Sequence, residues 1–257
     1  MPSILSEIKN SVAVITLNRP EKFNAFNREM ALLLQQTLDD CAADKNVRAI
    51  CITSVGKAFC SGQDITEITD DISKVEKAVA ECYNPIIKRI RNIEKPIVCA
   101  VNGVAAGAGA NIALCADVVI AAESATFVQA FSKIGLIPDC GGTFFLPRLI
   151  GFQKASALIM LGEKVSAIEA EKMGMIYKAI PDDSFVSETM RIATILSQLP
   201  LKALALTKQA LNFSTMNSLD EQLHVEDQLQ YTAANTADFK EGIKAFMEKR
   251  MPVFKGE

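Results

Sequence analysis

The segment Ala100–Arg148, AVNGVAAGAGANIALCADVVIAAESATFVQAFSKIGLIPDCGGTFFLPR, contains two glycine-rich turns that each precede a segment able to form a helix. The first turn, residues 103–109, follows the apolar run 96–101, which is typical of a buried strand. Backbone N–H groups at a helix start lack partners within the helix, and the peptide dipoles make that end partly positive. Small residues at 106–109 would let an anionic oxygen approach this backbone. The segment is therefore interpreted as one wall of an active site.

The second turn, GLIPDCGG at residues 135–142, places the carboxylate of Asp139 just before another expected helix. Aspartate is a preferred capping residue, so one interpretation of Asp139 is a helix N-cap. The other interpretation is an acid/base group, whose pKa desolvation in an apolar pocket would raise. The two roles are compatible, and the residues alone leave both open.

Short apolar runs alternate with segments of helical periodicity along the first two thirds of the chain, which indicates an α/β fold with sheets covered by helices. The first two runs indicate an antiparallel hairpin, Asn27 can cap the helix that follows, and Pro85 should kink or restart a later helix. Residues 56–65 are expected to form a loop. The expected strands are 5–8, 12–17, 46–53, 97–101, 118–121 and 175–180. One helix is expected to follow the first glycine turn and to run through Cys115. The other expected helices are 27–41, 73–92, 152–161, 166–173, 184–199, 201–213, 219–232 and 236–249.

Pro200 separates this mixed region from a segment that contains only expected helices. We therefore expect two parts, a core of residues 1–199 that holds the active site and a helical region of residues 200–257. No internal repeat or low-complexity tract is evident.

Composition limits the classes of partner. The net charge of −3, from 27 basic and 30 acidic residues, gives no general attraction to nucleic acid. The apolar runs are shorter than the ~20 residues that a membrane helix needs, and no charged-then-apolar leader begins the chain. The seven cysteines are scattered without a C-x-x-C pair and are expected to be reduced core residues. We expect a soluble, cytoplasmic protein without a metal, a nucleic-acid partner or a membrane partner.

Five ordered motifs are spread along nearly the whole chain: LNRP at 17–20 with Asn24-Ala25, FCSGQDI at 59–65, AVNG at 100–103 with GAG at 107–109, GLIP at 135–138 with GGT at 141–143, and FMEKR at 246–250. Together they resemble the motifs of the crotonase, or enoyl-CoA hydratase/isomerase, superfamily. The segments 82–85, 105–110 and 131–143 are most similar to the members of this superfamily that isomerise ring-1,2-epoxyphenylacetyl-CoA in phenylacetate breakdown.

The resemblance implies a spiral of ββα turns, a C-terminal helical region used in trimerisation, and a homotrimer or a dimer of trimers. It implies an acyl-CoA thioester as substrate, so that coenzyme A is part of the substrate and no separate cofactor is needed. The backbone N–H groups of Gln63 and Ala108 match the pair that holds the thioester oxygen in the family. The positions that match CoA- or substrate-binding residues are Lys22, Phe23, Ala25, Ser61, Gly62, Asp64, Ile65, Gly109, Phe131, Pro138, Phe246 and Lys249, the last of which would act from a neighbouring subunit.

The chain departs from the family's hydratases at the two glutamates that activate water. The matching residues are Asn111 and Phe131, and neither can act as a general base. Asp139 matches a position at which isomerases of the family carry an acidic residue. The leading hypothesis is an acyl-CoA isomerase that shifts an enoyl double bond or converts ring-1,2-epoxyphenylacetyl-CoA to oxepin-CoA, with Asp139 as proton shuttle. The alternatives are an enoyl-CoA hydratase that positions water with Asp139 and Asn111, and a non-catalytic acyl-CoA-binding protein.

Other polar residues carry weaker hypotheses. His224 is the single histidine and lies far along the chain from the serines near glycine turns, which argues against a Ser-His-Asp triad. The glycine turn lacks the lysine and hydroxyl of a phosphate loop. Lys22, Lys57 and Lys249 could meet CoA phosphates, although surface lysines are usually only solvated. Asp64 is expected to fix its own loop by local hydrogen bonds rather than to perform chemistry.

Overall fold

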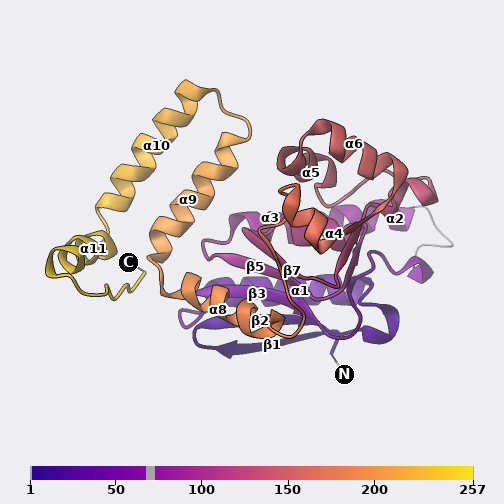
Figure 1. Ribbon diagram of the computed structural model, residues 1–257, viewed down its shortest axis with the longest axis horizontal. Helices are drawn as coiled ribbons and strands as arrows, with labels where there is room; N and C mark the ends of the chain where they lie inside the picture. Colours follow the sequence, from indigo (N-terminus) through magenta and orange to yellow (C-terminus); the bar gives the residue numbers. More distant parts are fainter. Residues whose placement is uncertain (1, 68–72, 257) are drawn as a thin grey trace.

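A computed structural model describes residues 2–67 and 73–256 of the chain, which form two β-sheets, helices that surround them, and a helical arm (Figure 1). The six-stranded sheet has the order β1-β2-β3-β5-β7-β10, and the four-stranded sheet has the order β4-β6-β8-β9. The strands are β1 Ile4–Lys9, β2 Val12–Leu17, β3 Ala49–Ser54, β4 Ala58–Cys60, β5 Ile97–Val101, β6 Val104–Ala106, β7 Val118–Ala122, β8 Thr126–Val128, β9 Lys164–Ser166 and β10 Lys178–Ile180.

The predicted N-terminal hairpin is confirmed. Strands β1 and β2 pair antiparallel, and β2, β3, β5, β7 and β10 then run parallel. Asn10 and Ser11 connect β1 to β2 with φ of 50° and 61°, the positive values that suit a two-residue hairpin turn. The central strand β5 is buried along its whole length, as expected for a parallel strand covered on both faces.

Helices pack around both sheets (Figure 1). The expected helices and the six strands of the larger sheet are confirmed in outline, whereas β8 and β9 of the smaller sheet were not expected. Asn27 caps α1 as predicted, because its side chain accepts a hydrogen bond from the Met30 N–H at 2.9 Å. The predicted restart at Pro85 is also found, since Pro85 lies in the first turn of α3. The helices are α1 Arg28–Ala43, α2 Ser73–Lys77, α3 Asn84–Asn92, α4 Ala108–Leu114, α5 Gly142–Ile150, α6 Phe152–Leu161, α7 Ala167–Lys172, α8 Phe185–Gln198, α9 Leu201–Ser214, α10 Leu219–Ala234 and α11 Ala237–Glu248, with the short helical turns η1 Pro20–Lys22, η2 Ile65–Glu67, η3 Ala78–Tyr83 and η4 Ala130–Ile134.

Two expectations about the glycine-rich region are wrong. The segment 56–65 is not entirely a loop, because it contains β4, and β5 does not lead directly into a helix, because β6 lies between β5 and α4. Both strands have three residues, too few to show a period in the sequence, and they form because β6 pairs with β4 and β8. Gly103 allows this arrangement, since a Cβ atom at that position would overlap the Lys57 carbonyl.

The C-terminal helices α9, α10 and α11 extend away from the sheets in Figure 1. Lys208 of α9 anchors the arm to the core: it is 7% exposed, and its Nζ lies 2.9 Å from a carboxylate oxygen of Asp117, which also pairs with Arg91 at 3.3 Å. The arm begins directly after Pro200. The division into parts at residues 199 and 200 and the role of the arm in trimerisation stay predictions.

All seven cysteines are free and buried, which confirms the prediction that they are reduced core residues. Burial raises the pKa of Cys51 and of Cys60 to about 12, so these thiols stay protonated at neutral pH. Within the part of the chain that the structure describes, every helix is too short or too polar to cross a bilayer.

Candidate active site

Three segments that are distant in sequence meet at the start of α4. The loop 22–26 lies along the loop 61–64 through backbone hydrogen bonds from Ser61 N to Phe23 O (3.0 Å), from Phe26 N to Gly62 O (2.7 Å) and from Asp64 N to Phe26 O (2.8 Å). The structure therefore brings together the two motifs that carry most of the predicted CoA-binding residues.

The loop at Gly62 also lies directly against the start of α4. A Cβ atom on Gly62 would lie 3.2 Å from the Ala106 carbonyl oxygen and 3.6 Å from the Ala108 nitrogen, and the φ of +100° at Gly62 is one that favours glycine. The first turn of α4 also packs closely against β4, since a Cβ atom on Gly109 would overlap the Cys60 carbonyl. The absence of side chains at Gly62 and Gly109 thus allows the loop that carries Gln63 to lie close to the helix start that carries Ala108.

The N–H groups of Gln63 and Ala108 have no recorded acceptor among residues 2–67 and 73–256. Ala108 is the first residue of α4, where N–H groups lack partners within the helix. Gln63 bridges Phe26 in parallel fashion, and because the Asp64 N–H points to Phe26, the Gln63 N–H points to the other side of the chain. Both donors are therefore available to a ligand.

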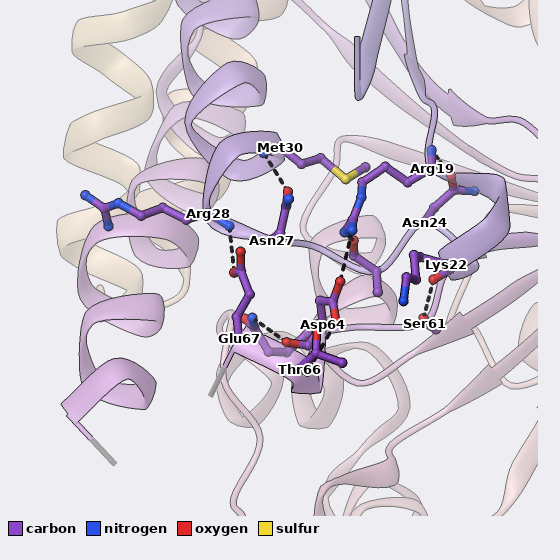
Figure 2. A network of polar contacts seen from close by, with 12 residues as sticks. Arg19, Lys22, Asn24, Asn27, Arg28, Met30, Ser61, Asp64, Thr66 and Glu67 are labelled. Atoms are coloured by element: carbon purple, nitrogen blue, oxygen red, sulfur yellow. Dashed lines mark hydrogen bonds and ion pairs between the residues drawn. The ribbon is translucent and has the colours of Figure 1, made fainter. Parts of the chain in front are cut away.

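A set of buried polar contacts holds these loops in place (Figure 2). Asn24 is 1% exposed, and its side-chain Nδ2 donates to the carbonyls of Val55 (2.8 Å) and Ala58 (2.7 Å). These bonds compensate the positive φ of 54° that Asn24 adopts. Asn24 thus fixes the shape of the loop that carries Lys22, Phe23 and Ala25.

The expectation that Asp64 fixes its loop is confirmed. Its carboxylate accepts hydrogen bonds from the Thr66 hydroxyl (2.7 Å) and from Arg19 Nη2 (2.9 Å), and both partners are drawn in Figure 2. Hydrogen bonds from Thr66 and Arg19 hold the pKa of Asp64 below its ordinary value. Asp64 is thus ionised and fully engaged, which suits a structural role better than proton transfer.

The other residues of these two loops that are predicted to bind CoA differ in their exposure to solvent. Lys22, Phe23, Ser61 and Ile65 are exposed around the joined loops, whereas Ala25 is buried. Figure 2 shows Lys22 beside Ser61, whose hydroxyl points to the Lys22 carbonyl at 3.5 Å. The exposed members form an open surface next to the Gln63 N–H, and their contact with CoA stays a prediction.

Asp139 lies just before α5, as predicted, but it is not the N-cap. The cap residue is Gly141, with φ of 73° and no side-chain hydrogen bond. Asp139 is partly buried, its Oδ1 has no hydrogen-bond partner in the described part of the chain, and burial raises the pKa of its carboxyl above the ordinary value. A desolvated carboxyl with a free oxygen is suited to accept and release a proton.

Asn111 holds the Asp139 turn in place. Its Nδ2 donates to the Asp139 carbonyl (2.9 Å), which also accepts from the Gly142 N–H (2.8 Å), and its Oδ1 accepts from Gln129 Nε2 (2.8 Å). Asn111 follows Ala108 by about one helical turn, so this bond ties the Asp139 turn to the first turn of α4. Phe131 is buried, and its ring lies 3.6 Å from the Cβ position of Gly107, the residue that precedes α4.

We predict that Asn111→Ala destabilises the fold by about 1–3 kcal/mol, because it leaves the buried Gln129 amide without its acceptor and removes one of the two donors to the Asp139 carbonyl. Activity should fall by up to about 10²-fold, since the Asp139 turn loses its support. Urea denaturation and steady-state kinetics measure the two effects, and Gln36→Ala, which removes an exposed amide that bonds Asp40, is the control. A loss of stability with unchanged kcat would show that Asn111 does not position Asp139.

Phe246 and Lys249 are not brought to this site within one chain. Phe246 is 83% exposed on α11, and Lys249 follows that helix with a φ of 53°. Figure 1 shows α11 at the far end of the arm, well away from α4 and α5. These two residues could therefore reach an active site only in another copy of the chain.

Tyr83 and Arg19 lie at the site, although the sequence analysis did not assign them to it. Tyr83 is 2% exposed, and its hydroxyl donates a hydrogen bond to the Gln63 side chain. Tyr83 and Gln63 line a cavity of about 550 Å³ beside α1 and η3, whereas Arg19 contributes through its ion pair with Asp64. The segment 82–85 carries part of the resemblance to isomerases, but the sequence does not show what Tyr83 contacts, because its environment depends on packing against distant segments.

Comparison with known proteins shows the family of the chain. The family model described as enoyl-CoA hydratase/isomerase matches residues 7–257. The chain therefore belongs to the enoyl-CoA hydratase/isomerase family and is an enzyme of that family, which confirms the family resemblance of its motifs.

Relatives in this family carry both isomerase and hydratase names. The chain is 44% identical to the 1,2-epoxyphenylacetyl-CoA isomerase of Escherichia coli (strain K12), over 100% of both chains. It is also 44% identical to a probable enoyl-CoA hydratase of Rhodobacter capsulatus, over 99% of this chain and 98% of that protein. The crystal structure of an enoyl-CoA hydratase from Bacillus anthracis superposes with a TM-score of 0.95 and 32% identity, over 99% of this chain and 100% of that one. The crotonase-like mixed α/β fold with a helical C-terminal region is thus confirmed.

Proposed function

We propose that the chain is an acyl-CoA isomerase in which Asp139 moves the proton and the N–H groups of Gln63 and Ala108 hold the thioester oxygen. The observation that supports this proposal most strongly is the pair of hydrogen bonds that the Asn111 side chain makes. It stands where hydratases of the family carry a glutamate, and its amide is committed to the Asp139 carbonyl and to Gln129. The second such position is the buried Phe131. Asp139 is the carboxyl that remains for proton transfer.

The chemistry follows from these groups. In a 3-enoyl-CoA, the Asp139 carboxylate removes a proton from C2, and the electron pair of the broken C–H bond enters an enolate whose oxygen is held by the two N–H groups. Asp139 then returns the proton to C4, which gives the conjugated 2-enoyl thioester. Donors aimed at the developing charge lower the barrier of both steps.

The acyl group can also be an epoxidised aromatic ring. The relative from Escherichia coli with 44% identity is named 1,2-epoxyphenylacetyl-CoA isomerase, which favours conversion of ring-1,2-epoxyphenylacetyl-CoA to oxepin-CoA as the physiological form of the reaction. Both substrates start from the same held thioester. The double-bond shift and the ring conversion therefore share Asp139, Gln63 and Ala108.

We further propose that Phe246 and Lys249 complete the CoA site of a neighbouring copy in a homotrimer. Their distance from the site of their own chain supports this assignment. The arm also exposes large apolar side chains that association would bury, namely Leu211, Met216, Leu219, Leu223, Tyr231, Phe239, Ile243 and Met247.

A hydratase is the second candidate, because the Rhodobacter capsulatus relative of equal identity carries a hydratase name. The two activities are separated by following the absorbance of the conjugated enoyl thioester with a 3-enoyl-CoA and, in parallel, with crotonyl-CoA. The isomerase proposal expects rapid conjugation of the former and slow hydration of the latter. Rapid hydration of crotonyl-CoA without any movement of a double bond would overturn it.

The pH dependence of the reaction should report Asp139. The base must be deprotonated to act, and burial raises its pKa, so kcat/KM should increase with pH through a midpoint above the value of about 3.9 for an ordinary aspartate. Initial rates between about pH 4 and about pH 8 measure the midpoint. A profile that is flat above about pH 4 would contradict a raised pKa.

A further inference from the structure

Tyr83 ends the π-helical segment η3, and the surrounding structure fixes its position. Its ring packs edge-to-face against Phe26 with a centroid distance of 6.2 Å. Gln35 of α1 donates from Nε2 to the carbonyls of Glu81 (2.9 Å) and Cys82 (3.1 Å), which holds the widened turn against α1. Such π-helical insertions often occur at functional sites.

The hydroxyl of Tyr83 faces the site. It donates to Oε1 of Gln63, the residue whose backbone N–H we assign to the thioester oxygen. Both side chains line the cavity of about 550 Å³ together with Asn27, Ala31 and Cys82, and charged residues such as Arg28, Glu67 and Lys77 line the rest of it. An acyl group that extends from the thioester into this cavity would pass the hydroxyl.

The phenol is also electrostatically suited to be a donor. Burial, with smaller contributions from Cys140 and Asp139, raises the pKa of Tyr83 far above its ordinary value, so the hydroxyl stays protonated. In the free protein its proton is held by Gln63, which is only partly buried and can exchange that bond for one to water. The donor can therefore turn to a ligand at little cost.

We infer that the Tyr83 hydroxyl donates a hydrogen bond to an oxygen atom within the acyl group, and that the site thus prefers acyl-CoA thioesters whose acyl group carries an ether-type oxygen over their hydrocarbon counterparts. This inference rests on the proposed function, because it takes the acyl group to enter the cavity from the Gln63 N–H. A hydrocarbon chain leaves Tyr83 bonded to Gln63, so it is accepted but not preferred.

The test compares matched thioesters that differ by one atom. The pairs are methoxyacetyl-CoA with butyryl-CoA and phenoxyacetyl-CoA with 3-phenylpropanoyl-CoA, and binding is measured by titration calorimetry. The intact protein should bind the ether member of at least one pair about tenfold more tightly, a difference of about 1.4 kcal/mol. Tyr83→Phe should bind both members equally, and Tyr177→Phe, at a tyrosine that is 67% exposed, should behave as the intact protein.

A second variant keeps the test decisive if Tyr83→Phe folds poorly. Gln63→Met retains the backbone N–H and removes the acceptor of the Tyr83 proton, so the preference for the ether should be retained or increase. Equal affinities in the intact protein, or a preference that survives in Tyr83→Phe, would overturn the inference. Loss of the preference in Gln63→Met alone would assign the recognition to Gln63. Since binding rather than turnover is measured, failure here is distinguishable from failure to isomerise a 3-enoyl-CoA.

Discussion

Asp139→Asn should lower kcat for 3-enoyl-CoA isomerisation by about 10²- to 10⁴-fold, because an amide has the shape of the carboxyl but cannot take up the proton. The KM should change little, since the donors to the thioester oxygen are backbone groups at other positions. Steady-state kinetics on the purified variant measure both constants. Asp183→Asn, which alters an exposed carboxylate, is the matched control and should keep full activity.

The same substitution should not destabilise the protein at neutral pH. The pKa of Asp139 is raised in the folded state, so its contribution to stability is fully present below the unfolded pKa and is lost as the pH rises through the folded pKa. Above that pH the wild-type carboxylate is a poorly solvated charge, which asparagine removes. A normal kcat for Asp139→Asn would exclude the carboxyl as the proton carrier, and a lost fold would mean that its role is structural.

Ala108→Pro should lower kcat by about 10²- to 10³-fold, the usual effect of removing one donor to a developing oxyanion. The proline nitrogen carries no hydrogen, and the ring occupies the space of the held oxygen. The helix itself should persist, because proline is well tolerated at the first helical position. Gly107, with φ of 51° and ψ of −123°, has the freedom to precede it.

Ala108→Gly is the matched control for this variant, since it alters the same side chain but keeps the N–H. Its kcat should stay within about tenfold of the wild type, a margin that covers the lower helix propensity of glycine. Circular dichroism and thermal melting check that both variants are folded. Equal kcat values for the proline and glycine variants would mean that the Ala108 N–H does not hold the thioester oxygen.

Much of the architecture follows from local patterns. The Asn27 cap, the Pro85 restart and the helices of the arm depend on residues within a few positions of each other, so the sequence predicts them. Strands β4 and β6 could not be predicted in this way. Three residues show no period, and they become strands only because distant segments pair with them.

The residues of the site also differ in whether the sequence alone could identify them. Asp139 and the N–H groups of Gln63 and Ala108 lie in motifs that can be matched to a family, so the sequence analysis could assign them. Tyr83 could not be assigned, because its role depends on the contact with Gln63, which is twenty positions away. The N-cap interpretation of Asp139 was wrong because Gly141 takes that place in the left-handed conformation.

The most direct test of proton transfer by one carboxylate follows a label through the reaction. A 3-enoyl-CoA in which both hydrogens on C2 are replaced by deuterium is converted in ordinary water, and the product of the earliest turnovers is analysed by NMR. If Asp139 removes the C2 deuteron and returns it, part of the product carries deuterium at C4, and Asp139→Asn forms almost none of this product. A product that carries only protium at C4 would contradict the single-carboxylate shuttle.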